Sequence, residues 1–253
     1  MPTKVLVLCA TGKLGGGVAA GLKSLGLDVY GTTRSAGGAA SLERKGIHPI
    51  VANYVVRGDV DRALRESGAS VLVFLTDFFL AAGHKVGVEA AQGCMMVDAA
   101  KAAGIQHAIF LSVGDADLFD ARPQVKHIHA KMKVEAHLKA SGLRHSILRP
   151  VAFYENLDDA ANWNPLKKGS VKFLTACPTF LVSTFDVGLA AGAMIQAPEA
   201  WSGKTLECAS SKETIQEVAA ALQRVSGVPV KGGLAMPMCL RSLFLSDLHH
   251  MCL

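Results

Sequence analysis

His127 and Lys131 are the two residues whose types and spacing most directly indicate chemistry. They lie four residues apart in the segment KHIHAKMKVE, which begins at Lys126. In an α-helix this spacing is about one turn, so the two side chains share a face. An imidazole titrates near neutral pH and can supply a proton, and an ammonium group donates hydrogen bonds. We therefore treat both as candidate catalytic residues. The alternative for His127 is an ordinary histidine on a helix surface.

A glycine-rich loop follows the first apolar run of the chain. In VLVLCATGKLGGG, Gly12 and Gly15 stand between a strand-like run and a helix-like segment. Backbone amides at such a helix start point toward a bound phosphate, and glycine lets a pyrophosphate approach closely. The place of this loop, at the head of a repeating strand–helix pattern, favours a dinucleotide site. The alternative is a tight turn without a ligand.

Cys9 breaks the expected glycine pattern, because it occupies the first glycine position of a Gly-x-x-Gly-x-x-Gly loop. One interpretation is a small, buried residue that the turn tolerates. The other is a functional change, either weaker cofactor affinity or a thiol whose pKa is lowered near the positive end of a helix. Both interpretations stay open at the level of the sequence.

Arg34 indicates which dinucleotide the loop would select. The second expected strand ends in Gly31, Thr32 and Thr33, followed by Arg34 and Ser35, with no acidic residue. A site that prefers NAD(H) usually has an aspartate or glutamate here for the ribose hydroxyls. A guanidinium instead offers two parallel donors to a 2′-phosphate. We therefore predict NADP(H) as the cofactor; the alternative is a solvated loop cation.

The elements that must position these residues follow a regular βα alternation, which predicts an α/β fold with a Rossmann-type, doubly wound parallel sheet. Apolar, β-branched runs predict strands at 4–8, 28–33, 48–53, 70–75, 107–113 and 145–150. Amphipathic segments between them predict helices at 14–26, 39–46, 60–68, 84–103 and 125–141.

The alternation loosens after Val151. We expect a helix over 184–200 that begins at Asp186 as its N-cap, a strand over 204–210 and a helix over 214–227. The chain is therefore predicted to contain an NADP(H)-binding Rossmann domain over 1–150. A smaller C-terminal lobe over 151–253 would complete the cleft as part of one integrated unit.

Composition narrows the classes of protein. The chain has 253 residues, of which 50% are hydrophobic, and 26 basic against 21 acidic residues give a net charge of +5. The basic residues form no run, so the charge is compatible with an anionic small ligand and gives no support for specific nucleic-acid binding. The longest apolar run, VLVFLTDFFLAA, is too short to span a bilayer and contains Asp77. We expect a cytoplasmic protein, or an organellar one if the sequence is a processed form.

The cysteines and histidines do not indicate a metal site. The six cysteines include no Cys-x-x-Cys pair, which favours reduced thiols over disulfides or a zinc site. His249, His250 and Cys252 lie close together near the end of the sequence without inward-facing ligand spacing. No metal is predicted.

Five segments together resemble the NmrA-like family of atypical short-chain dehydrogenases/reductases, over about residues 4–227. The segments are ATGKLGGGV (10–18), TTRS (32–35), VDAAKAAGIQHAIFLSV (97–113), HIHAKMKVEAHLKASGLRHSILRP (127–150) and FYENL (153–157). The resemblance implies a Rossmann domain with a small C-terminal lobe and NADP(H) on the glycine loop. It also implies one of two kinds of activity: reduction of small organic substrates, or sensing of the NADPH/NADP⁺ ratio through a change of partners.

The resemblance carries a set of cofactor-binding residues. It implies Gly12, Lys13, Leu14 and Gly15 on the phosphates, Arg34 on the 2′-phosphate, Asn53 near the adenine, Thr76 and Asp77 along the cleft, Ser112 beside the nicotinamide, Lys131 on the nicotinamide ribose, and Pro150, Phe153 and Asn156 flanking the ring. Three positions depart from the usual pattern. Cys9 replaces a glycine, and Asn53 often is an aspartate in the family. His127 stands where other dehydrogenases have a tyrosine, although a histidine is itself common at this position among NmrA-like members. The tail beyond Val228 is shorter than usual.

Three functions remain open from the sequence. The first is an NADP(H)-binding redox sensor or regulator with little or no catalysis. The second is an NADPH-dependent reductase of a small carbonyl, quinone or imine, which would use Lys131 with His127 or a water as the proton source, since hydride transfer needs one. The third is an accessory or scaffold subunit of a larger complex. A protein partner and a homodimer are compatible with each of them.

Overall fold

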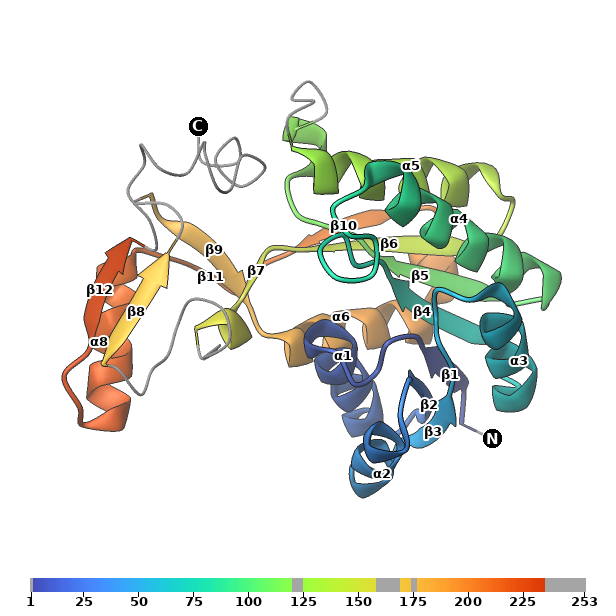
Figure 1. Cartoon of the computed structure of the whole chain (residues 1–253), viewed down its shortest axis with the longest axis horizontal. Helices are drawn as coiled ribbons and strands as arrows, with labels where there is room; N and C mark the ends of the chain where they lie inside the picture. The colour runs from blue at the N-terminus through green and yellow to red at the C-terminus, as the bar shows by residue number, and fades with distance from the viewer. Residues whose placement is uncertain (1, 120–124, 158–168, 174–176, 235–253) are drawn as a thin grey trace.

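The computed structural model describes residues 2–119, 125–157, 169–173 and 177–234. Its centre is a seven-stranded parallel sheet in the order β10-β6-β5-β4-β1-β2-β3 (Figure 1). The strands are β1 (Lys4–Val7), β2 (Asp28–Thr33), β3 (His48–Val51), β4 (Val71–Leu75), β5 (His107–Leu111), β6 (His145–Pro150) and β10 (Thr205–Cys208). The order reverses between β1 and β4, and in such sheets ligands bind outside the carboxyl ends of the strands at this point.

Helices cover both faces of the sheet, as the Rossmann prediction requires (Figure 1). One face carries α1 (Lys13–Ser24), α2 (Ala36–Arg44) and α6 (Thr184–Gln196), and the other carries α3 (Arg57–Ser67), α4 (Val86–Ala102) and α5 (Lys126–Ala140). Strand β1 shows why both layers form. Val5 and Val7 belong to one apolar core, and Leu6 and Leu8 to the other. Successive side chains point to opposite faces of a strand, so a continuous apolar run requires cover on both sides.

The predicted strands at 28–33 and 145–150 have the bounds that the structure shows, and the other predicted elements of the sheet layer differ from it by a few residues at their ends. One N-cap prediction is wrong. Helix α6 begins at Thr184, and its N-cap is Ser183, whose hydroxyl accepts a hydrogen bond from the Phe185 amide. Asp186 lies within the first turn of that helix. A serine hydroxyl caps a helix as well as a carboxylate does, so residue type alone did not distinguish the two.

The chain after residue 150 contributes to both parts of the molecule. Strand β10 pairs in parallel with β6, and α6 packs along α1. The predicted helix over 184–200 is two helices, because the short α7 (Pro198–Trp201) follows α6. The other elements after residue 150 extend from the side of the main sheet (Figure 1). They are β7 (Ala152–Phe153), η2 (Tyr154–Asn156), β8 (Ser170–Phe173), β9 (Thr179–Val182), β11 (Ser211–Glu213), α8 (Ile215–Ser226) and β12 (Lys231–Leu234). Residues after 150 therefore do not all belong to a separate lobe, because α6 and β10 pack with the Rossmann sheet and helices. The division of the chain into two parts stays a prediction.

Glycines bring α1 and α6 into close contact. A Cβ atom on Gly17 would lie 2.0 Å from Thr184 Oγ1, and one on Gly21 would lie 2.5 Å from the Phe185 carbonyl oxygen. On α6, a Cβ on Gly188 would lie 2.6 Å from the Val18 carbonyl oxygen. The three missing side chains allow the two backbones to touch. The glycine-rich start of α1 thus serves helix packing as well as the loop before it.

Buried His107 makes stability depend on pH. The side chain is 2% exposed, and its Nε2 lies 2.9 Å from the Ser146 hydroxyl. Burial lowers the pKa of His107 to about 4 from its usual 6.5. The unfolded chain binds this proton more readily, so the contribution is complete above about pH 6.5 and is lost as the pH falls toward 4.

We expect a His107→Phe variant, which cannot charge, to lose stability less steeply than the wild type over this range. Between pH 7 and pH 5 the wild type should lose about 2 kcal/mol more than the variant, at 1.36 kcal/mol for each of the roughly 1.5 pH units below the usual pKa of His107. Urea unfolding of both proteins at pH 7 and pH 5 measures it. Parallel pH profiles for the two proteins would contradict the assignment.

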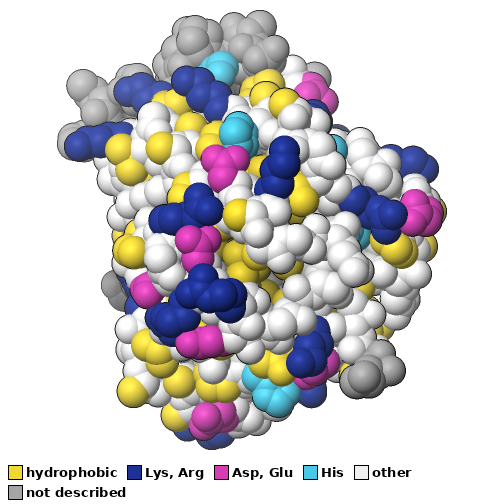
Figure 2. Space-filling model, turned by 90° about the vertical axis from the view of Figure 1, so that its right-hand side faces the viewer, with side chains coloured by type: hydrophobic (Ala, Val, Ile, Leu, Met, Phe, Trp, Pro, Cys, Tyr) yellow, Lys and Arg dark blue, Asp and Glu magenta, His cyan; other side chains and the backbone are white. Residues whose placement is uncertain are grey.

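Charges of both signs are interspersed on the face drawn in Figure 2. On α3, for example, Arg57 pairs with Asp61, and Arg62 pairs with Asp59 and Glu66. The side chains of these pairs are partly exposed to solvent, which screens the charges, so each pair contributes little to stability. This face provides no single-sign patch of the kind that nucleic acid requires.

Candidate functional site

A small cavity lies at the carboxyl ends of β1 and β2, where the glycine loop meets the residues after β2. Its volume is about 110 Å³, and its lining is Cys9, Thr11, Gly12, Thr32, Thr33, Arg34, Ala52 and Tyr54. The sequence placed two of these residues, Gly12 and Arg34, in the cofactor site. The structure brings them together across one cavity, although they are far apart in sequence. Asn53 itself does not line the cavity, but its neighbour Ala52 does.

Gly15 is required by the shape of the glycine loop. A Cβ atom on Gly15 would lie 2.3 Å from the Cys9 carbonyl oxygen and 2.9 Å from the Cys9 carbonyl carbon, closer than real side chains approach backbone. The same Cys9 carbonyl accepts a hydrogen bond from the Gly12 amide at 3.0 Å. The loop therefore folds tightly back on the start of α1. Lys13 and Leu14 open the helix, with Leu14 partly buried against the core.

Cys9 adopts the backbone conformation that glycine would adopt, with φ of +58°. Its amide donates to the Thr32 hydroxyl at 2.8 Å, which ties β1 to β2 at the loop. Burial raises the pKa of the Cys9 thiol, so the thiol stays protonated near neutral pH. The interpretation as a thiol of lowered pKa is therefore wrong. Burial also raises the pKa of the neighbouring Tyr54 hydroxyl.

Lys131 lies on the other side of the switch point, at the end of β4. Its Nζ donates to Glu89 Oε1 at 2.7 Å, to Thr76 Oγ1 at 3.0 Å and to the Thr76 carbonyl oxygen at 3.1 Å. The sequence predicted both Lys131 and Thr76 as site residues, and the structure joins them. Asp77 has a local role, since its Oδ1 accepts from the Phe79 and Leu80 amides at 3.0 Å.

His127 is buried beneath the loop that follows β4. Only 7% of the residue is exposed, and its ring centroid lies 6.1 Å from that of Phe78 and 5.9 Å from that of Phe79. The ring of His84 contacts both phenylalanines edge-on. The interpretation of His127 as a surface histidine is therefore wrong. The loop with Phe78 and Phe79 therefore covers the imidazole of His127.

Lys13 and Asn156 are far apart in sequence but in contact in the structure. Lys13 Nζ donates to Asn156 Oδ1 at 2.7 Å, and this contact links the glycine loop to η2. Asn53 Oδ1 lies 3.4 Å from the Val55 amide as part of a local turn. Phe153 lies in β7, partly buried against the main core, and the Pro150 carbonyl accepts from the Gly114 amide at 2.9 Å.

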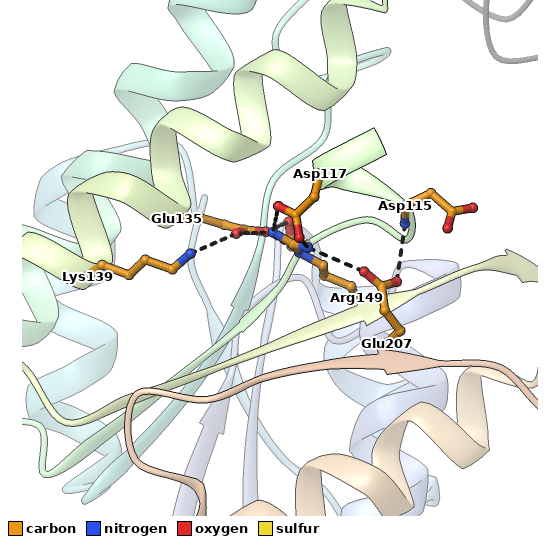
Figure 3. A network of polar contacts seen from close by, with 7 residues as sticks. Asp115, Asp117, Glu135, Lys139, Arg149 and Glu207 are labelled. Carbon is orange, nitrogen blue, oxygen red and sulfur yellow. Dashed lines mark hydrogen bonds and ion pairs between the residues drawn. The ribbon is translucent and has the colours of Figure 1, made fainter. Parts of the chain in front are cut away.

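Ser112 directly follows β5 and is hydrogen-bonded to Glu135, a member of the polar network around Arg149 that Figure 3 draws. Its hydroxyl donates to Glu135 Oε1 at 2.6 Å. Arg149 donates to both oxygens of the same carboxylate, at 2.9 and 2.8 Å, and to Asp117 and Glu207. These hydrogen bonds raise the pKa of Arg149 and lower that of Asp117. The network joins α5, β6, β10 and the turn after β5, and it fixes the direction of the Ser112 hydroxyl.

Several residues of the site were missed by sequence reasoning. Glu89, Glu135 and Arg149 were assigned no role. Glu155, in the segment FYENL, was likewise assigned no role, yet its Oε1 accepts hydrogen bonds from the Thr184 amide and hydroxyl at the start of α6. An acidic residue within an apolar helix face, such as Glu89, is a usable signal, because charges are rarely buried without partners.

The described part of the chain contains no group of three histidine, cysteine, aspartate or glutamate residues that could hold a metal ion. His249, His250 and Cys252 lie outside the described residues. Nor does any helix in the described ranges combine the length and apolarity that a membrane crossing needs.

The fold and the site define a Rossmann-type α/β protein with a glycine loop at the switch point of its sheet. Residues 1–247 match the NmrA-like family, and the chain belongs to that family.

Solved structures resemble this fold over most of its length. Triphenylmethane reductase from a Citrobacter species is 20% identical, with 96% of this chain and 82% of the reductase covered and a TM-score of 0.73. NmrA, a negative transcriptional regulator solved with NAD, is 20% identical, with coverage of 94% and 75% and a TM-score of 0.74. The NADPH-dependent quinone oxidoreductase QOR2 from Escherichia coli is 24% identical, with coverage of 96% and 86% and a TM-score of 0.69. Identities of this size establish the shared fold alone.

Proposed function

We propose that this chain binds NADP(H) and acts as a redox sensor or regulator with little or no catalysis. The observation that carries the proposal is the cavity between the glycine loop and Arg34, which is open at the carboxyl ends of β1 and β2. A guanidinium beside threonine hydroxyls fits a 2′-phosphate. The tight Gly15 turn, with no space for a side chain, fits the close approach of a pyrophosphate.

The similar structures are compatible with either dinucleotide. The Citrobacter reductase was solved with NADP(H), and QOR2 with NADPH, whereas NmrA was solved with NAD. Arg34 favours NADP(H) for this chain, since no acidic residue lies beside it after β2. The smaller C-terminal part would complete the cleft, and the Lys13–Asn156 hydrogen bond supports this arrangement.

The low catalytic activity that we propose rests on the state of His127 and of two hydroxyl groups that could also donate a proton, those of Tyr154 and Ser112. The Tyr154 hydroxyl is hydrogen-bonded to Ser211, and the Ser112 hydroxyl donates to Glu135. His127 lies beneath Phe78 and Phe79. Each of these three groups is thus engaged or covered, and hydride transfer needs a donor within hydrogen-bond reach of the substrate oxygen. A sensor needs only the bound dinucleotide and a partner that responds to it.

Replacing Arg34 with alanine tests the cofactor assignment. We expect the Kd for NADPH to rise by about tenfold to a hundredfold, since a hydrogen bond to a charged group is worth about 1.5–3 kcal/mol. The Kd for NADH should change little. Fluorescence titration of both dinucleotides measures the two values. Arg44→Ala, which removes the same charge from the last turn of α2, is the matched control and should leave both constants unchanged.

NADH binding as tight as NADPH binding in the wild type would contradict the proposed preference. Failure of the wild type to bind any dinucleotide would contradict the function itself, and co-purification in a complex would then favour the accessory-subunit alternative. Dinucleotide binding without turnover of quinones and aldehydes supports the sensor.

A second candidate is an NADPH-dependent reductase of a small carbonyl or quinone. It is favoured by the position of His127 one helical turn from Lys131 on α5, because both groups would act if the loop over His127 opened. Turnover by the wild type, lost in His127→Asn with NADPH affinity retained, would establish this alternative.

A further inference from the structure

Glu89 is a buried carboxylate whose role no motif of the sequence indicates. It lies in the first turn of α4, with none of its surface exposed. Its Oε1 accepts hydrogen bonds from Lys131 on α5 and from the hydroxyl of Thr76, which directly follows β4. An isolated buried carboxylate is strongly unfavourable, so Glu89 depends on the Lys131 ammonium as its counter-charge.

The ammonium group of Lys131 is held from two sides. Glu89 contacts it from α4, and Thr76 offers it a hydroxyl and a carbonyl oxygen from the end of β4. The lysine side chain is 13% exposed. A free lysine side chain loses rotamer entropy when a ligand fixes it, so holding it in place before the ligand arrives removes that cost from binding.

The packing around Glu89 leaves little freedom for rearrangement. Gly93, one turn further along α4, approaches its neighbours so closely that a Cβ there would lie 2.3 Å from Val134 Cγ2 and 3.0 Å from Thr76 Cγ2. Helix α4 is thereby pressed against α5 and the end of β4. Within the described residues, Glu89 Oε2 is buried and has no hydrogen-bond partner. A buried oxygen without a donor costs stability, which indicates that this carboxylate is present for its charge on Lys131 and not for the fold.

The Glu89–Lys131–Thr76 group and the Arg34 cavity lie on opposite sides of β1. Thr76 follows β4, on one side of β1 in the sheet, whereas Arg34 follows β2, on the other. A dinucleotide bound across the switch point spans both sides. Its adenosine half would meet Arg34, and its nicotinamide half would meet Lys131.

We infer that Glu89 is a positioning residue, which holds the Lys131 ammonium at the end of β4 to bind the nicotinamide half of the dinucleotide. The inference rests on the proposed NADP(H)-binding function. Glu89 then contributes to dinucleotide affinity through Lys131. It affects the binding of the nicotinamide half and not that of the adenosine half.

Glu89→Gln tests the inference with two ligands. NADPH reaches both sides of β1, whereas adenosine 2′,5′-bisphosphate has no nicotinamide half and reaches only the Arg34 side. We expect the Kd for NADPH to rise about tenfold, since a charge-assisted hydrogen bond is replaced by a neutral one, and the Kd for the bisphosphate to stay unchanged. Asp98→Asn, which makes the same chemical change at an exposed site on α4, is the control and should change neither constant.

A double-mutant cycle separates positioning from a general effect on the fold. In a Lys131→Met background, Glu89→Gln should have no further effect on the Kd for NADPH, because the group that it positions is absent. Additive effects, an unchanged Kd for NADPH, or an equal loss of affinity for both ligands would overturn the inference.

If Glu89→Gln does not fold, Thr76→Val provides a second test. It removes one acceptor of Lys131 and should weaken the binding of NADPH alone, and equal effects on both ligands would again overturn the inference. If the wild type binds NADPH no more tightly than it binds the bisphosphate, the inference alone is contradicted. If the wild type binds neither ligand, the proposed function is contradicted as well.

Discussion

Replacing Arg149 with methionine is expected to lower the free energy of unfolding by about 3–5 kcal/mol, the cost of breaking a buried ion pair by removing one partner. Arg149 and Glu135 have side chains that are 5% and 3% exposed, and they share two hydrogen bonds. Methionine fills a similar volume but leaves the Glu135 carboxylate buried with the Ser112 hydroxyl and a more distant Lys139. The turn after β5 would also lose the bonds from Arg149 to Asp117.

Urea unfolding at pH 7 measures this loss. Arg144→Met is the matched control, because Arg144 pairs with Glu199 at 2.7 Å but both side chains are exposed, at 38% and 80%. Its effect should stay below about 1 kcal/mol. Similar losses from the two variants would show that burial of the Arg149 network does not have the importance assigned to it.

Replacing Gly15 with alanine is expected to weaken NADPH binding about tenfold to a hundredfold, because a shifted loop would lose a hydrogen bond to a charged phosphate, which is worth about 1.5–3 kcal/mol. The added methyl group would overlap the Cys9 carbonyl group, so the turn from Cys9 to Gly12 must shift. Overpacking of this kind also costs about 1–3 kcal/mol of stability. Dinucleotide titration and urea unfolding measure the two effects.

Gly37→Ala is the control for the Gly15 experiment. Gly37 lies in α2 and has no atom within 4 Å of the position that a Cβ would occupy. Alanine there should leave NADPH binding unchanged and raise stability by up to about 1 kcal/mol, since alanine is the better helix former. Equal binding by the Gly15→Ala variant and the wild type would rule out a cofactor role for this loop.

The fold was predictable because its signals are local. A fully apolar run such as β4 is buried on both faces of the sheet, and glycines such as Gly104 mark the ends of helices. The pairing of β10 with β6 is different, since the partners are far apart in sequence and several loose segments separate them. No pattern within residues 204–210 states which edge of which sheet that strand will join.

The candidate site was predictable where the residue pattern that indicates it lies within one short segment. The glycine loop with Gly12 and the segment after β2 with Arg34 are examples. It was not predictable where function depends on contacts between distant helices. The partner of Lys131 is Glu89, 42 residues earlier, and the burial of His127 depends on Phe78 and Phe79 in a separate loop. The backbone of Cys9 shows the same limit, because the positive φ of this residue reflects the turn around it and not its own preference.

The contact between α1 and α6 has a consequence for how the chain acquires its structure during synthesis. Helix α1 is made more than 150 residues before α6, the helix that covers its glycine face. Until then, the glycine face of α1 stays exposed, and β6 remains an edge strand with unpaired backbone groups, because β10 is made later still. A nascent chain that stops near residue 150 is therefore prone to self-association, and stable folding awaits residues that lie beyond the Rossmann repeat itself.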